Sequence, residues 1–212
     1  MNKNIPGWMN EKELLILSTL AGHVPDHGSI LEIGCFLGSS TTALYDGKKS
    51  TVSVDVVDCF KGFSRPELVE KSFKDLFLVG KEEFYYRART VAIEQGWEQA
   101  FKYCIGDAMY NNISIYSTTS KEFIKSKSYD LTYIDASHTE EDVTFDINKY
   151  ISTTDLLIGD DYYPWYNGVP IALNQTRDER TLIVFENTKL WALIPKIGYW
   201  RDVFKNNNLL FL

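Results

Sequence analysis

Residues 29–40 read Ser-Ile-Leu-Glu-Ile-Gly-Cys-Phe-Leu-Gly-Ser-Ser and decide the fold class of this chain. The first part is short, apolar and closed by Gly34, which predicts a buried strand. The serines at the end open a helix, whose N-terminal N–H groups would face the same turn. Gly34 lets the backbone approach a ligand closely. We therefore expect a ligand at this turn, and its candidate binding residues are Glu32, Gly34, Gly38 and Ser39.

Strand and helix patterns alternate along most of the chain. Further strands are expected at 51–58, 101–105, 129–134 and 155–158, and helices at about 10–21, 140–150 and 169–178. The segment at about 64–99 has helical patterns with breakers at Gly80 and Gly96, so we expect a helical insertion there. This order predicts an α/β fold with a mostly parallel sheet covered by helices on both faces.

The C-terminal part departs from this alternation. Residues 180–185 and 189–194 both have strand character, and only Glu186-Asn187-Thr188 separates them. So short a loop permits only an antiparallel pair. At 212 residues the chain, 1–212, fits one domain of ordinary size.

Composition excludes several classes of function. No apolar run is long enough to span a membrane, and nothing near the N-terminus resembles a secretory signal, so a cytoplasmic protein is expected. The net charge of −7 and the scattered basic residues disfavour a nucleic-acid partner. Cys35, Cys59 and Cys104 lack the spacing of a zinc site and suit reduced thiols.

The turn after Gly34 lacks the full glycine pattern of a dinucleotide-binding loop. Such a loop uses two further glycines to admit a pyrophosphate and to pack the helix against the strand. Phe36 and Ser39 stand at those positions. A ligand without phosphates is therefore favoured over NAD.

Two acids beyond the turn are candidates for binding a nucleoside. Asp55 lies 21 residues after Gly34 and is expected to end the second strand, where it could accept hydrogen bonds from two ribose hydroxyls. Asp107, in Gly106-Asp107-Ala108, is expected to close the third strand beside an adenine edge. Taken singly, either acid could instead cap a helix or lie in an exposed turn.

These features together resemble the class I S-adenosylmethionine-dependent methyltransferases over nearly the whole chain. The resemblance rests on the turn after Glu32, on Asp55, on Gly106-Asp107-Ala108, on Tyr-Asp-Leu-Thr-Tyr-Ile-Asp-Ala-Ser-His at 129–138 and on the late strand pair. It implies a Rossmann-like three-layer sandwich whose seven-stranded sheet is mostly parallel, with an antiparallel C-terminal strand. It also implies S-adenosylmethionine as the cofactor, with Glu32 and Gly34 near its methionine end, Asp55 near the ribose and Asp107 near the adenine.

A second group of residues could carry the chemistry. Asp135 and the pair Asp160-Asp161 end two strands predicted to be neighbours, so three carboxylates could converge as Mg²⁺ or Ca²⁺ prefers. Otherwise one acid would have to be protonated, or these acids would only order their loops. A narrower likeness, to the small-molecule O-methyltransferases of the cephalosporin-hydroxylase and macrolide-sugar type, implies that these acids hold Mg²⁺. His138, three residues after Asp135, is the candidate general base, although it could be a loop histidine bonded to a carboxylate.

We therefore predict an S-adenosylmethionine-dependent O-methyltransferase that acts on a small hydroxylated acceptor, with Asp135 and His138 as catalytic residues and Mg²⁺ as a second cofactor. The sequence leaves open an NAD(P)-dependent oxidoreductase and a non-catalytic binding protein that keeps the fold. It also leaves open whether the chain forms a homo-oligomer.

Overall fold

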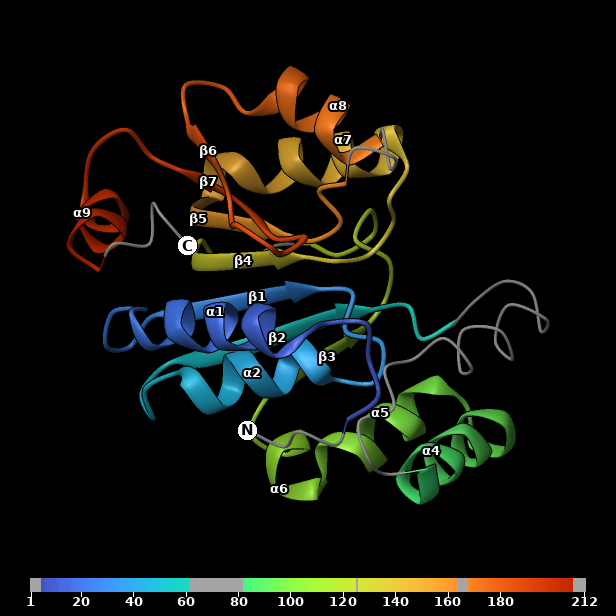
Figure 1. The fold of residues 1–212 in the computed structure, drawn as a ribbon. Coiled ribbons are helices and arrows are strands. Elements are labelled where there is room, and N and C mark those ends of the chain that lie inside the picture. The colour runs from blue at the N-terminus through green and yellow to red at the C-terminus, as the bar shows by residue number, and fades with distance from the viewer. Residues whose placement is uncertain (1–4, 62–81, 125, 164–167, 208–212) are drawn as a thin grey trace.

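The structure is a computed structural model that describes residues 5–61, 82–124, 126–163 and 168–207. At its centre is a seven-stranded sheet with the strand order β3-β2-β1-β4-β5-β7-β6 (Figure 1). All neighbouring strands are parallel except at β7, which is antiparallel to β5 and to β6. The strands are β1 (Ser29–Ile33), β2 (Ser53–Asp58), β3 (Ser114–Ser117), β4 (Tyr129–Ile134), β5 (Thr154–Gly159), β6 (Thr181–Val184) and β7 (Trp191–Ile194). The predicted fold class is confirmed.

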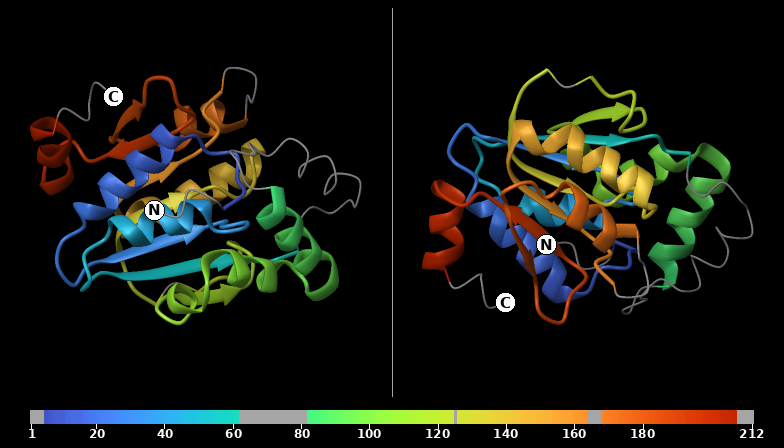
Figure 2. Two further views of the ribbon diagram at one scale, coloured as in Figure 1. Left: turned by 60° about the horizontal axis from the view of Figure 1, so that its bottom comes forward. Right: turned by 90° about the horizontal axis from the view of Figure 1, so that it is seen from above.

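Helices cover both faces of this sheet. The two faces have separate apolar clusters, one with residues of α1, α2, α5 and α9 and the other with residues of α7 and α8. Figure 2 shows α1 and α2 on one side in its left view, and α7 and α8 on the other in its right view. No helix within the described ranges is long and apolar enough to cross a membrane. The helices are α1 (Glu11–Gly22), α2 (Ser39–Gly47), α4 (Glu82–Gln95), α5 (Trp97–Ile105), α6 (Asp107–Tyr110), α7 (Glu140–Tyr150), α8 (Gly168–Thr176) and α9 (Tyr199–Asn206), with a 3-10 turn at Ile151–Thr153.

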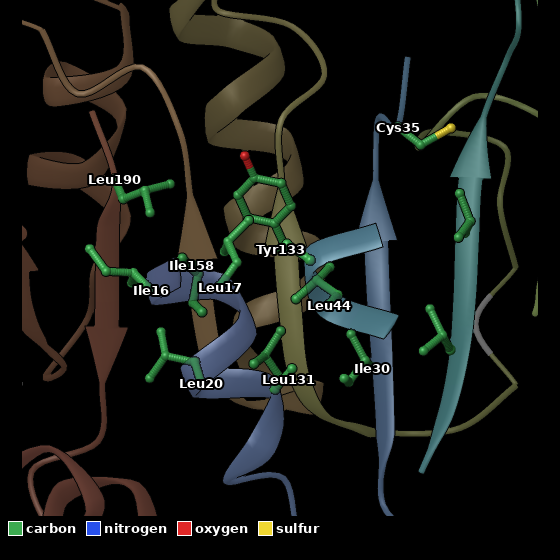
Figure 3. Close-up of a cluster of buried hydrophobic side chains, with 14 of the residues drawn as sticks. Ile16, Leu17, Leu20, Ile30, Cys35, Leu44, Leu131, Tyr133, Ile158 and Leu190 are labelled. Atoms are coloured by element: carbon green, nitrogen blue, oxygen red, sulfur yellow. The ribbon is translucent and has the colours of Figure 1, made fainter. Parts of the chain in front are cut away.

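The core follows from the alternation of side chains along buried strands. Ile30 belongs to the cluster under α1 and α2, and the next residue, Leu31, belongs to the cluster under α7 and α8. Figure 3 shows Leu17 and Leu20 of α1 packed over Leu131 and its neighbours on the sheet. Both faces are covered, so every residue of β1 and all but Asp130 of β4 are buried, as is typical of a parallel sheet.

A reciprocal cap fixes the start of α1. The Asn10 side chain accepts a hydrogen bond from the Glu13 N–H at 3.0 Å, and the Glu13 carboxylate accepts one from the Asn10 N–H at 2.8 Å. The second oxygen of Glu13 accepts the backbone N–H of Lys189 at 2.9 Å. This buried acid therefore ties the leading helix to the residue that precedes β7.

One predicted strand is wrong. Residues 101–105 form the second half of α5, and the third strand is instead β3 (Ser114–Ser117). The strand at Tyr129–Ile134 and the helix at Glu140–Tyr150 are confirmed at their predicted bounds. Of the helical insertion expected at about 64–99, residues 64–81 lie outside the described residues, and the remainder contains α4 and the start of α5.

The strand order places a topological switch point between β1 and β4. The chain leaves β1 toward β2 on one side and leaves β4 toward β5 on the other, so the connections diverge there. In open α/β sheets, ligands bind outside the carboxyl ends of the strands at such a point. A ligand site is therefore expected among the residues that follow β1, β2, β4 and β5.

Candidate functional site

A cavity of about 910 Å³ opens at the carboxyl ends of the strands, around the switch point. Its wall combines the N-terminal segment with the loops that follow five strands. The lining segments are Pro6–Met9, Ile33–Phe36 after β1, Val57–Phe60 after β2, Thr118–Lys121 after β3, Asp135–His138 after β4 and Asp160–Asp161 after β5, together with Ser39, Ser40, Trp97, Asp142, Asp146, Tyr163 and Lys189.

The glycine turn has the close backbone approach expected of it. Gly34 has φ +84°, and a Cβ added there would lie 2.2 Å from the carbonyl oxygen of Asp135. No other residue fits, because both the conformation and the space exclude a side chain. Gly34 and Ser39, at the start of α2, line the cavity. Gly38 does not line it: its φ is +92°, and an added Cβ would come within 2.3 Å of Ile105, so it lets α5 pack closely.

Glu32 lies behind the turn and does not line the cavity. Its carboxyl group is fully buried and accepts hydrogen bonds from the hydroxyls of Ser40 at 2.5 Å and Thr41 at 2.6 Å. Burial raises the pKa of Glu32 to about 8, although both hydroxyls act in the opposite direction. The structure therefore gives Glu32 a supporting position under α2.

The acid at the end of β2 is Asp58, and the prediction that Asp55 ends this strand is wrong. Asp55 lies within β2, where it is buried and bonded to the Tyr129 hydroxyl at 2.9 Å and the Lys127 ammonium at 3.0 Å. Asp58 is the last residue of β2 and lines the cavity. Its Oδ2 accepts the N–H of Cys35 at 2.9 Å. The strand predicted at 51–58 already ended at Asp58, so the last residue of that strand was the signal for it.

Asp107 also lies elsewhere than the sequence suggests. It begins α6, its side chain is 78 % exposed, and it pairs with Lys102 at 3.4 Å. It does not line the cavity, because the strand that it was expected to close is a helix. The loop Thr118–Lys121 follows the true third strand and lines the cavity in its place.

The candidate chemical residues do come together. Ligand atoms of Asp135, His138 and Asp161 all lie within 4.8 Å of one another. Nδ1 of His138 is 2.7 Å from Oδ2 of Asp161. Lys189, which was not singled out from the sequence, reaches Asp160 Oδ2 at 2.7 Å and Asp161 Oδ1 at 3.4 Å. The group formed by Asp135, His138, Asp160, Asp161 and Lys189 is called the acidic centre below.

Burial and mutual repulsion set the protonation of the acidic centre. Burial first, and then the charges of Asp160 and Asp161, raise the pKa of Asp135 to about 7. Burial also raises the pKa of Asp160, against the effect of Lys189. At Asp161 burial opposes ionisation, but His138 and Lys189 outweigh it and lower the pKa. The hydrogen bond to Asp161 raises the pKa of His138, against burial.

The acidic centre fits a hard divalent cation. Mg²⁺ and Ca²⁺ prefer oxygen ligands, and Asp135, Asp160 and Asp161 supply carboxylate oxygens. The Oδ1 atom of Asp160 is buried and has no hydrogen-bond partner among the described residues. A buried carboxylate oxygen without a partner is costly unless a cation or donor meets it. Lys189 occupies only the other oxygen of that carboxylate.

Aromatic side chains form another part of the cavity wall. Phe36 has φ +48°, and its ring lies between Trp8, with ring centres 5.0 Å apart, and Trp97, at 5.4 Å. Such rings supply an apolar surface against which a flat ligand can stack. Phe36 thus stands where a dinucleotide loop would need a glycine, and it closes the turn against the N-terminal segment.

Solved structures share this fold at low sequence identity. An O-methyltransferase from Bacillus cereus, in complex with SAH, matches with a TM-score of 0.51 and 14% identity over 89% of this chain and 83% of that one. The SAH-bound methyltransferase PaMTH1 from Podospora anserina matches with a TM-score of 0.53 and 15% identity over 90% and 80%. A ribosomal protein L11 methylase from Lactobacillus delbrueckii subsp. bulgaricus matches with 0.52 and 13% over 91% and 81%. The comparison with curated proteins gave no match.

A match to a sequence model assigns the chain to a family. The sequence model of a family described as "Methyltransferase domain" matches residues 31–161, which is more than half of the chain. The matched region begins in β1 and ends at Asp161, so it contains the glycine turn and most of the acidic centre. The resemblance to the class I methyltransferases is confirmed, and the chain belongs to this methyltransferase family.

Proposed function

We propose that this chain transfers the methyl group of S-adenosylmethionine to a hydroxyl group of a small acceptor, with the help of Mg²⁺. One observation carries the proposal: a single cavity holds the glycine turn and Asp58 on one side of the switch point and the acidic centre on the other. The first group suits a nucleoside cofactor, and the second suits the handling of a hydroxyl proton.

The cofactor would lie along the ends of β1 and β2. Gly34 admits it close to the backbone, and the start of α2 at Ser39 presents N–H groups to it. Asp58 would accept a hydrogen bond from one ribose hydroxyl, since a carboxylate offers about four acceptor positions and its three backbone N–H contacts leave one of them. The SAH bound to the Bacillus cereus and Podospora anserina proteins supports this choice of cofactor.

Methyl transfer from a sulfonium needs alignment more than activation of the methyl group. The acceptor oxygen would attack the methyl carbon as the carbon–sulfur bond breaks, leaving S-adenosylhomocysteine. The proton of the acceptor hydroxyl would pass to His138, which Asp161 holds in a fixed orientation. Asp135 would help to orient the acceptor from its buried position beside His138.

Asp135, Asp160 and Asp161 would hold the Mg²⁺. A divalent cation at this place lowers the pKa of the acceptor hydroxyl. The cavity wall also disfavours a polyanionic acceptor, because six aspartates line it against two lysines. Small hydroxylated acceptors, as in the O-methyltransferases of the cephalosporin-hydroxylase and macrolide-sugar type, remain the proposed substrates.

Cofactor binding tests the proposal through two acids of one strand. Wild-type protein should bind S-adenosylhomocysteine in calorimetry, and Asp58→Asn should weaken this binding about 10- to 100-fold, because it removes charged acceptors from the ribose. Asp55→Asn is the matched control: it should lower the melting temperature through lost contacts with Lys127 and Tyr129, but leave the affinity unchanged. Failure of the wild type to bind, or binding of NADH in its place, would contradict the proposal.

Metal binding is tested separately with Mg²⁺ alone. Asp160→Asn should lose most of the Mg²⁺ affinity measured by calorimetry, since it removes an unpartnered buried oxygen as a charged ligand. The affinity for S-adenosylhomocysteine should stay within about twofold of the wild type. Asp155→Asn, at the exposed start of the same strand, is the control. Equal Mg²⁺ affinity in Asp160→Asn and the wild type would show that the acidic centre holds no metal.

A further inference from the structure

Glu13 lies in the leading helix, outside the cavity wall, yet it contacts the hairpin that supplies the ammonium group of the acidic centre. It is 1 % exposed, and its carboxylate accepts the backbone N–H of Lys189 at 2.9 Å. One position earlier in α1, Lys12 donates a hydrogen bond to the carbonyl oxygen of Glu186 at 2.8 Å. Two successive residues of α1 thus hold the turn between β6 and β7.

The backbone of Lys189 is held on both sides. Its N–H is bonded to Glu13, and its carbonyl oxygen accepts the N–H of Tyr162, in the loop after β5, at 2.9 Å. The next residue, Leu190, is fully buried in the apolar cluster that contains residues of α1 (Figure 3). The main chain at Lys189 is therefore fixed between α1 and the loop after β5.

This fixed main chain bears on where the Lys189 ammonium lies. A lysine has a long, flexible stem, so holding its charge in one place costs conformational entropy. The ammonium is nevertheless 2.7 Å from Asp160 Oδ2 and 3.4 Å from Asp161 Oδ1, and the side chain is 12 % exposed. An anchored backbone lowers this cost, because the stem then starts from a fixed point. A loose backbone would let the ammonium move out into water.

We infer that Glu13 is a positioning residue that holds Lys189 as the built-in counter-ion of the acidic centre. With regard to Mg²⁺, this inference rests on the proposed function. A cation that enters the acidic centre must share Asp160 and Asp161 with the ammonium, so the ammonium contacts limit the affinity for the cation. The leading helix thereby influences metal binding from outside the cavity.

Chemical labelling of lysines tests the position of Lys189 in metal-free protein. Acetic anhydride modifies lysine side chains that can leave their ion pairs, and mass spectrometry gives the rate at each lysine. In the wild type, Lys189 should react at least about tenfold more slowly than Lys196, which is 62 % exposed. Glu13→Met fills the space without offering an acceptor and should raise the rate at Lys189 at least about fivefold. Lys149, which is bonded to carbonyl oxygens of another loop, should keep its rate and so reports any general loosening.

Asn10→Ala is the matched control. Asn10 caps the same helix by accepting the Glu13 N–H, so its loss should lower the melting temperature. It leaves the bond between Glu13 and Lys189 in place, and the labelling rate at Lys189 should stay near the wild-type value. If Glu13→Met raised this rate no more than Asn10→Ala does, Glu13 would only cap the helix and the inference would be overturned. Equal rates at Lys189 and Lys196 in the wild type would overturn it as well, and this comparison needs no variant.

A double substitution extends the test to Mg²⁺. With Lys189 present, Glu13→Met should raise the Mg²⁺ affinity in calorimetry at least about threefold, because the ammonium then competes less for Asp160 and Asp161. In a Lys189→Met background, Glu13→Met should raise it less than about twofold. The same change in both backgrounds would mean that Glu13 acts by its own charge, and would overturn the inference. If neither the wild type nor Lys189→Met bound Mg²⁺, the proposed metal site would be wrong, and the labelling rates alone would decide the inference.

Discussion

Glu32 shows how one buried residue can govern the stability of the glycine turn after β1. Its carboxyl group lies under α2, held by Ser40 and Thr41, and the nearby acids Asp58 and Asp135 add to the effect of burial on its pKa. A neutral carboxyl group suits this place better than an ionised one. The support of the glycine turn should therefore depend on pH.

The sign of this dependence follows from the two pKa values. Glu32 has a pKa of about 8 in the folded chain against an ordinary value of 4.5, so between these values only the folded chain keeps the proton. The free energy of unfolding should then fall as pH rises from about 5 to about 8. Glu32→Gln copies the neutral form and should reduce this fall by on the order of 1–3 kcal/mol. Urea unfolding of ligand-free protein at pH 5.5 and 8 measures the change.

A matched substitution isolates the effect of burial. Glu179→Gln changes a carboxyl group that is 82 % exposed, and the pH dependence should stay as in the wild type. If Glu32→Gln kept the full wild-type slope, the carboxyl group of Glu32 would have to be ionised in the folded chain.

The sequence alone located some of the residues that line the cavity and misplaced others. Gly34, Asp135, His138 and Asp161 were predicted and line one cavity, because each lies in the turn that follows a buried strand. Asp55 was placed at a strand end in error. Val56 and Val57 continue the buried strand beyond it, so the carboxylate faces Lys127 and Tyr129. The predicted strand, 51–58, has the correct end, so the choice of the wrong acid within it was enough to exchange a structural acid for a lining one.

At the scale of elements, one helix was mistaken for a strand for an identifiable reason. Residues 101–105 form a short span rich in aromatic and β-branched residues, which fits a strand. The buried residues of α5 show a helical pattern instead. They are Ala100, Phe101, Cys104 and Ile105, which recur at helical spacing. Over five residues the two periods cannot be separated, and only the longer window from Trp97 decides.

The strand that was missed lacks the signal that would reveal it. β3 lies at the edge of the sheet and pairs only with β2. Its four residues are exposed or half-buried, and the apolar alternation that marks them is limited to Ile113 and Ile115. Because of this error, Asp107 was expected beside the cavity, where the loop after β3 lies instead. By contrast, α7 and β4 bury one or both faces and were predicted at their bounds.

At the scale of the whole molecule, the C-terminal hairpin completes the site from a distance. Lys189 precedes β7 and is far along the chain from the glycine turn, yet it is the cation of the acidic centre. Its backbone N–H is bonded to Glu13 of α1. Pattern analysis finds a hairpin at 180–194, but it does not show which strand the hairpin joins. Only the pairing of β7 with β5 brings Lys189 beside Asp160.

This placement makes Lys189 and a divalent cation alternative sources of positive charge. Lys189→Met should lower the free energy of unfolding by about 3–5 kcal/mol in metal-free buffer, since buried carboxylates lose their partner. Added Mg²⁺ should recover part of this loss, and it should stabilise the variant more than the wild type because its charge replaces that of the ammonium. Urea unfolding with and without MgCl₂ measures both effects, with Lys205→Met on the exposed side of α9 as the control.

Two outcomes would contradict this prediction. If Lys189→Met were as stable as the wild type without metal, the carboxylates of the folded chain would have to be neutral already. If Mg²⁺ stabilised both proteins equally, the cation would have to bind away from Asp160 and Asp161.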